Sequence, residues 1–214
     1  MKRIPVAGEA KRLLLPLLAI FLISFFLGQK ILSILSFIFA IFVLYFFRDP
    51  ERFTDLDKNF ILSPADGKVL NLETKDYKDF ELERCYVISI FMSPLDVHVN
   101  RSPCDGEILT VQHEPGRYYG AFKHGVEKTN ERNYILLKDG DKKILVIQIA
   151  GFLARRIFCY VRKGMKVSRG QRIGMIAFGS RVDVCLPPDY DIIVRKGEKV
   201  KAGITPIAKR SGGL

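Results

Sequence analysis

Residues 86–91 read Tyr-Val-Ile-Ser-Ile-Phe, a run of β-branched and aromatic side chains that is typical of a β-strand. Residues 145–149 predict another strand of the same kind. Both belong to a series of short apolar runs that Gly, Pro and Asp separate: 68–70, 86–91, 134–137, 143–149, 157–161 and 191–194. Because this part of the chain lacks long amphipathic helical patterns, we expect a mainly β domain, closed as a β-barrel or layered as a sandwich.

Two local patterns recur in this region. Residues 63–69 and 102–108 both read Ser-Pro-x-Asp-Gly-x-Val/Ile. Residues 161–174 resemble the turn-and-strand unit of lipoyl-like hybrid barrels, and residues 194–203 repeat that unit. The glycines suit turns that need positive φ, and the Val, Met and Ile between them supply strand faces. We therefore expect a quasi-symmetric β architecture of the lipoyl-like hybrid type.

The N-terminal segment is strongly apolar. Residues 13–27 and 31–47 carry no charge, and only Gly28-Gln29-Lys30 separates them. As helices they would measure about 22 and 26 Å, less than the roughly 30 Å hydrocarbon core of a bilayer. We expect residues 1–47 to form a membrane-anchoring hydrophobic helical hairpin and residues 48–214 to form the β domain. Whether the hairpin crosses the bilayer stays open, and its short segments favour insertion into one leaflet.

The charge pattern indicates the cytoplasmic face of a cell membrane. The chain has 34 Lys and Arg against 23 Asp and Glu, which gives a net charge of +11. Basic residues precede the first apolar run and Arg48 follows the second, so both ends of the hairpin favour the cytoplasm. A basic domain suits an anionic membrane, and the anchor argues against nucleic acid as a partner.

Cysteine and histidine form no recognisable metal-binding pattern. The four cysteines lack Cys-x-x-Cys spacing, and the three histidines include no His-x-His pair. We expect reduced thiols and no metal site. His113 and His124 belong to a segment rich in Gly and Tyr, which we interpret as a surface loop outside the catalytic set.

One Gly-Ser pair carries possible chemistry. Residues 176–184 read Ile-Ala-Phe-Gly-Ser-Arg-Val-Asp-Val, so Gly179 and Ser180 lie between two apolar segments. On composition alone, a tight turn is the simpler interpretation. The pair also meets the needs of backbone self-cleavage, because glycine leaves its carbonyl accessible and the serine Oγ can attack that carbonyl through a five-membered ring.

Behind the apolar segment, the chain resembles the phosphatidylserine decarboxylase family in the short form found in bacteria and archaea. The matching motifs follow the order of the family from residue 47 to residue 180. They are Phe-Arg-Asp-Pro at 47–50, Ser-Pro-Ala-Asp-Gly at 63–67, Met-Ser-Pro-Leu-Asp-Val-His-Val-Asn-Arg at 92–101, Asn-Glu-Arg-Asn at 130–133 and Phe-Gly-Ser at 178–180.

The resemblance implies a proenzyme. Ser180 would attack Gly179, and the chain would divide into residues 1–179 and 180–214, which stay together as a heterodimer. Ser180 would become a covalent pyruvoyl group that forms a Schiff base with the substrate amine and accepts electrons as CO2 leaves. Phosphatidylserine would thus become phosphatidylethanolamine without an external cofactor. The serine phospholipid could carry ester-linked chains or, as in archaetidylserine, ether-linked chains.

The resemblance also implies candidate site residues. His98 is the candidate acid or base, and Asp66 would orient a base or assist Ser180. Arg101 stands where longer relatives have a second histidine, so the base for self-cleavage stays open. Candidates for contact with the lipid head group are Arg101, Arg132 and Asn133, of which the last two could equally brace a turn.

Two other classes of function compete with this interpretation. A non-catalytic, membrane-tethered hybrid-barrel module would need a modifiable lysine at a hairpin tip, and Lys163 lacks the flanking Met usual in such carriers. A zinc peptidase would need several closely spaced His and Asp ligands, which the sequence does not offer.

Overall fold

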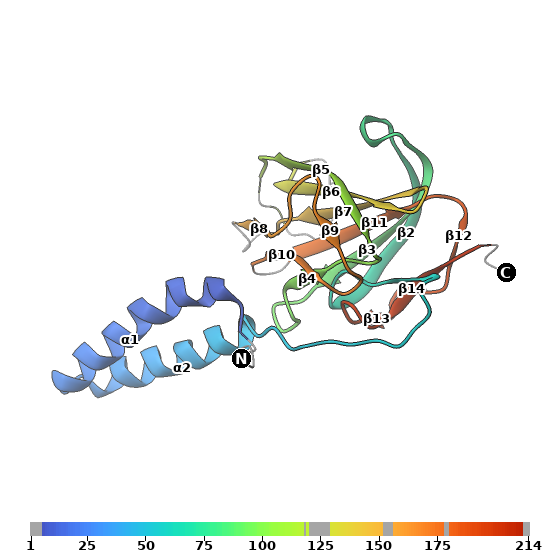
Figure 1. Cartoon of the computed structure of the whole chain (residues 1–214). Coiled ribbons are helices and arrows are strands. Elements are labelled where there is room, and N and C mark those ends of the chain that lie inside the picture. The colour runs from blue at the N-terminus through green and yellow to red at the C-terminus, as the bar shows by residue number, and fades with distance from the viewer. Residues whose placement is uncertain (1–5, 118, 120–128, 152–155, 178–179, 212–214) are drawn as a thin grey trace. The chain divides into compact units, whose positions relative to one another are not determined.

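The computed structural model describes residues 6–117, 119, 129–151, 156–177 and 180–211 (Figure 1). The chain divides into two compact units, Met1–Glu51 and Arg52–Leu214. The domain boundary predicted between residues 47 and 48 falls just before this division.

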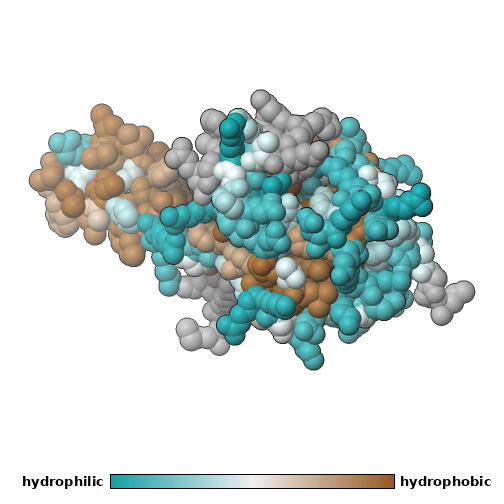
Figure 2. All heavy atoms as spheres, turned by 90° about the horizontal axis from the view of Figure 1, so that it is seen from above, coloured by the Kyte–Doolittle hydropathy of each residue, from teal (hydrophilic) through white to brown (hydrophobic). Residues whose placement is uncertain are grey.

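The first unit is helical, as expected. A short 3-10 helix, η1 (Gly8–Ala10), leads into α1 (Lys11–Phe26), and α2 (Lys30–Phe46) follows. The hydroxyls of Ser24 and Ser33 lie 2.9 Å apart and link the two helices. Large apolar side chains along both helices are exposed, and Figure 2 shows a mostly hydrophobic surface there. Among the described residues, no helix combines the length and hydropathy that crossing a bilayer requires.

A curled, antiparallel eight-stranded sheet forms the body of the second unit, and the mainly β prediction is confirmed. Its strands lie in the order β13 (Lys199–Val200), β2 (Gly67–Tyr77), β3 (Leu82–Met92), β11 (Ser180–Leu186), β7 (Lys142–Ile149), β6 (Arg132–Asp139), β5 (Gly106–Glu114) and β9 (Lys166–Val167). A 3-10 helix, η2 (Lys78–Phe80), joins β2 to β3.

Two three-stranded sheets complete this unit. One has the order β1 (Phe60–Leu62), β14 (Pro206–Arg210), β12 (Tyr190–Ile192). The other has the order β4 (Val99–Arg101), β10 (Arg172–Ile176), β8 (Ile157–Cys159).

The repeated sequence motifs occupy equivalent places at the two ends of the large sheet. β2 and β5 both begin at the glycine of Ser-Pro-x-Asp-Gly. In one copy the Ser63 hydroxyl donates to the carbonyl oxygen of Ala65 at 2.6 Å, and in the other Ser102 donates to Cys104 at 2.7 Å. The two turn-and-strand units also occupy equivalent places. β13, in the unit 194–203, pairs with β2, and β9, in the unit 161–174, pairs with β5.

Strand β11 lies in the middle of the sheet, between β3 and β7, and is buried along its whole length. Side chains alternate between the two faces of a strand. Val182 and Val184 therefore join the larger apolar core with Ile88 and Ile90, whereas Cys185 joins a smaller core on the opposite face. Ser180 shares the face of Val182, so its side chain belongs to the larger core.

Candidate active site

Ser180 is the first residue of β11 and is fully buried. It lies opposite Met92 in the pairing of β11 with β3, and its Oγ donates to the Met92 sulfur at 3.4 Å. The cleavage partner predicted from the sequence, Gly179, lies outside the described residues.

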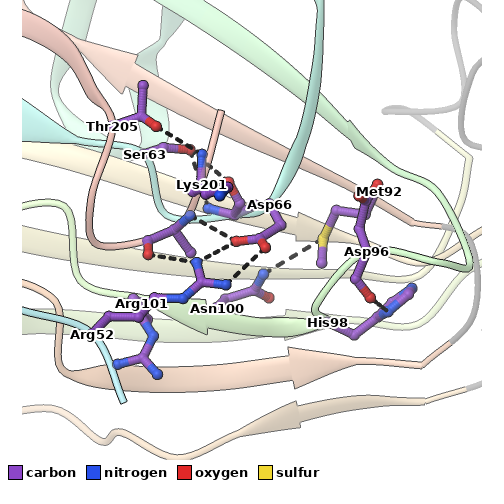
Figure 3. Close-up of polar contacts among 12 residues, drawn as sticks. Arg52, Ser63, Asp66, Met92, Asp96, His98, Asn100, Arg101, Lys201 and Thr205 are labelled. Carbon is purple, nitrogen blue, oxygen red and sulfur yellow. Dashed lines mark hydrogen bonds and ion pairs between the residues drawn. The ribbon is translucent and has the colours of Figure 1, made fainter. Parts of the chain in front are cut away.

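His98 is also fully buried, directly before β4 (Figure 3). Its Nδ1 lies 2.9 Å from the carbonyl oxygen of Asp96. Because a carbonyl oxygen only accepts, Nδ1 donates in this contact, and in the neutral form of the ring the lone pair is on Nε2. The loop around this contact is closed by the Asp96 carboxylate, which accepts from the Ser93 amide at 2.8 Å.

The backbone brings His98 close to the segment that leads to Ser180. The carbonyl oxygen of His98 accepts from the amide of Ile176, the last residue of β10, at 3.3 Å. Ser180 follows Ile176 after three residues and then pairs with Met92. The link between β10 and β11 therefore begins beside His98 and ends at Ser180.

Buried amides continue from Met92 into the core. Asn100 Nδ2 donates to the Met92 sulfur at 3.6 Å, as Figure 3 shows, and Gln148 Nε2 donates to Asn100 Oδ1 at 2.8 Å. Asn133 Nδ2 in turn donates to Gln148 Oε1 at 2.9 Å. Sequence reasoning assigned no role to Met92, Asn100 or Gln148. Met92 and Asn100 belong to the motif at 92–101, and Gln148 is a polar residue inside the apolar run 143–149.

Asp66 lies at the centre of a separate polar cluster (Figure 3). Arg52 donates to both carboxylate oxygens, one of them at 2.8 Å, and the Ala202 amide donates to Oδ1 at 2.8 Å. Arg101 is 2% exposed, and its Nη1 donates to the carbonyl oxygen of Gly170 at 2.9 Å. Asp66 thus has Arg52 and a backbone amide as hydrogen-bond donors.

The two remaining candidates on β6 point to opposite faces of the sheet. Asn133 is buried in the amide chain, whereas Arg132 forms an ion pair with Glu114 at 2.6 Å. The expectation for His113 needs correction: it lies within β5, because its segment pairs with β6, and its Nε2 is 3.6 Å from Glu131. His124 lies outside the described residues.

A buried ion pair occupies the other face of β11. Arg181 Nε and Nη2 donate to the Asp183 carboxylate at 2.6 and 2.8 Å, and Arg181 also donates to the Ser89 hydroxyl at 2.8 Å. Burial raises the pKa of Asp183. Within the described part of the chain, no three His, Cys, Asp or Glu side chains come together as a metal site would require.

Comparison with known proteins agrees with the sequence motifs. The profile of the phosphatidylserine decarboxylase family matches residues 39–208. A phosphatidylserine decarboxylase proenzyme of Syntrophus aciditrophicus is 44% identical over 184 residues, which cover 86% of each chain. Another, of Symbiobacterium thermophilum, is 39% identical over 98% of this chain and 97% of its own. A Methanocaldococcus jannaschii protein provisionally named archaetidylserine decarboxylase proenzyme is 45% identical over 78% of this chain and 89% of its own.

Proposed function

We propose that this chain, which belongs to the phosphatidylserine decarboxylase family, removes CO2 from the serine head group of a phospholipid after cutting its own backbone. The observation that carries the proposal is the family match across residues 39–208, which includes the Gly179-Ser180 pair of the sequence, with Ser180 buried at the start of a central strand. The product would be the corresponding ethanolamine phospholipid.

Self-cleavage would begin at Ser180. Its Oγ would attack the carbonyl carbon of Gly179, the amide C–N bond would break, and an ester would replace it. Loss of the Ser180 α-proton would then expel the ester oxygen with the upstream chain, and hydrolysis with release of ammonia would leave a pyruvoyl group. That group supplies a ketone that withdraws electrons from the substrate as CO2 departs.

The residues around Ser180 fit such a group. Position 180 is fully buried, so a small ketone there would be shielded from bulk water. Strand pairing on both sides of β11 would keep it in place after the cut. We propose His98 as the group that moves protons, because its Nδ1–H contact with Asp96 leaves Nε2 as the basic nitrogen.

We propose that Asp66 is a positioning residue. Both of its oxygens accept hydrogen bonds from Arg52, and one also accepts from the Ala202 amide. These contacts suit a carboxylate that braces the start of β2 against the turn before β14. For Arg101, Arg132 and Asn133 we retain contact with the lipid head group as a proposal, with Asn133 acting through Gln148.

Residues 180–214 would remain bound to residues 1–179 after the cut. They supply β11, which pairs with β3 and β7, and β13, which pairs with β2. β14 pairs with β1 in the same way. These ladders support a non-covalent heterodimer. We also propose that the β architecture is of the lipoyl-like hybrid type, because its repeated turn units pair with equivalent strands.

We propose that the first unit is a helical hairpin inserted in the cell membrane, with the β domain on the cytoplasmic face. Exposed apolar side chains on both helices support insertion, because a helix that is hydrophobic all round needs apolar surroundings.

An exposed basic strip on the β domain supports an anionic membrane as the partner. The strip comprises Lys68, Arg195, Lys196, Lys199 and Lys201, and among the described residues none of the five forms an ion pair. Lys199 lies opposite Lys68 in the pairing of β13 with β2, an unfavourable arrangement that an anionic surface would relieve. At the equivalent place, Lys166 lies opposite Glu107.

Mass spectrometry of the intact purified protein tests the proposed function. We expect two polypeptides, the smaller beginning at residue 180 with a blocked, hydrazine-reactive end. Ser180→Ala should stay uncut and inactive, whereas Ser168→Ala, which removes an exposed hydroxyl, should be cut normally. An uncut wild-type chain with full activity, or a Ser180→Ala chain that turns over substrate, would refute the proposal.

The M. jannaschii relative favours one alternative substrate, an ether-linked serine phospholipid. Release of CO2 from matched ester-linked and ether-linked serine lipids in detergent micelles distinguishes the two.

Vesicle binding tests the basic strip. Lys68→Glu/Lys199→Glu should weaken the salt-sensitive part of binding to phosphatidylglycerol-containing vesicles, and Lys166→Glu serves as the control. Equal losses in both variants would remove the basic strip from the proposal.

A further inference from the structure

A row of buried polar side chains ends at the Ser180 hydroxyl. We call it the Met92 network, and its members are Asn133, Gln148, Asn100, Met92 and Ser180. Every member is at most 2% exposed. The donors all point along the row toward the sulfur of Met92, which accepts from Asn100 on one side and from Ser180 on the other.

Stability alone does not account for this network. A polar group inside a core costs free energy unless it is hydrogen-bonded, and even a satisfied buried network is often no more stable than apolar side chains of the same shape. The fold also makes room for it at Gly174, where a β-carbon would lie 2.7 Å from Gln148 Nε2. Buried polar groups of this kind are better explained by a requirement for orientation.

The sulfur of Met92 suits the control of a nucleophilic hydroxyl. A thioether is a weak acceptor, so it orients the O–H bond of Ser180 through a weaker hydrogen bond than a carboxylate or an amide oxygen would form. A methionine side chain is otherwise flexible, because it has three rotatable bonds. The contact from Asn100, whose own amide is oriented by Gln148, restricts that freedom.

We propose that Met92 is a positioning residue for self-cleavage: its sulfur, oriented by Asn100 and Gln148, sets the rotamer from which Ser180 Oγ attacks the preceding carbonyl. The inference rests on the proposed self-cleavage. In that step the Oγ–H proton passes to a base, the Oγ–C bond forms, the base hands the proton to the nitrogen and the C–N bond breaks, while Met92 exchanges no atom. The oxygen then leaves with the upstream chain, so the contact with Met92 exists only before the cut.

The proposal predicts different effects on the rate of self-cleavage and on the rate of CO2 release. Substitution of Met92 should slow maturation and leave the turnover of matured protein nearly unchanged. Met92→Leu keeps an apolar side chain of similar size and removes the acceptor. Met175 offers a matched control, because it is equally buried in β10 and has no hydrogen bond to its sulfur among the described residues.

The experiment follows cleavage of the full chain after a pulse of cell-free synthesis in detergent micelles, and then CO2 release per cleaved chain. We expect Met92→Leu to slow cleavage about fivefold to tenfold, because the hydrogen bond that holds Ser180 in the attacking rotamer is lost, with CO2 release per cleaved chain within about twofold of the wild type. Met175→Leu should change neither rate.

A second test avoids any change of shape. In a Met165→Leu/Met175→Leu chain, replacing methionine by norleucine exchanges the sulfur of Met92 for a methylene group and should slow cleavage to the same extent. Cleavage of Met92→Leu at the wild-type rate, equal slowing by Met175→Leu, or an equal loss of CO2 release per cleaved chain would each overturn the inference. A wild-type chain that never cleaves would instead refute the proposed function.

Discussion

Replacing Arg52 by Gln should strongly destabilise the β domain. Arg52 donates to both oxygens of Asp66, and its Nη1 also donates to the carbonyl oxygen of Ala202 at 2.7 Å. The side chains of Arg52 and Asp66 are only 6% and 12% exposed. The substitution therefore leaves a carboxylate in the interior, and of its donors among the described residues only the Ala202 amide is unchanged.

The size of the effect follows from this burial. Removing one partner of a buried ion pair typically costs about 3–5 kcal/mol, because the other charge is left uncompensated. Since glutamine can still donate one hydrogen bond, we expect Arg52→Gln to cost about 3 kcal/mol. The double variant Arg52→Gln/Asp66→Asn buries no charge, so it should cost less than the single variant, about 2 kcal/mol or below.

Urea unfolding measures these differences, followed by the β-sheet signal in circular dichroism. A Ser180→Ala background keeps the chain in one piece, and a non-ionic detergent covers the helices. Lys58→Gln is the control, because it breaks an exposed ion pair with Asp105 and should cost less than about 0.5 kcal/mol. A cost below about 1 kcal/mol for Arg52→Gln, or a double variant less stable than the single one, would refute the reasoning.

Three further predictions concern the same domain. Gly174→Ala should destabilise it by about 1–3 kcal/mol, measured by urea unfolding, because the new β-carbon would meet Gln148 and a backbone oxygen. The hydrogen bond from the Arg169 amide lowers the pKa of Asp105, so stability should fall as pH drops through that lowered pKa, and Asp105→Asn should flatten the acid limb of a thermal-melt series. Arg169→Ala should speed proteolysis of residues 52–59, because the guanidinium binds the carbonyl oxygens of Leu56 and Asp57; unchanged cleavage would contradict this.

Much of the fold could be predicted from local pattern. The runs at 86–91 and 143–149 lie within β3 and β7, because β-branched and aromatic side chains suit a buried sheet. The run at 157–161 gave only β8, which ends at Cys159, since Tyr160 and Val161 leave the strand for a turn. The strand order could not be predicted, because pairing between β11 and both β3 and β7 depends on contacts far apart in sequence.

The candidate site was less accessible to sequence reasoning. Ser180 and His98 were identified through the family resemblance, since a Gly-Ser pair and a single loop histidine are common in any protein. The Met92 network could not be predicted, because its members come from β3, β4, β6, β7 and β11, and their contact depends on the packing of these strands. A lone Asn or Gln in an apolar strand gives no hint of its partner.

The central location of β11 has a consequence for how the two halves of a cut chain would behave. A strand with a ladder on each edge can leave only if both ladders open, and that amounts to unfolding the sheet. Dilution would therefore not separate residues 180–214 from the rest, and fragments from different molecules would not exchange while folded. The pair would act as one kinetic species whose lifetime equals that of the native state.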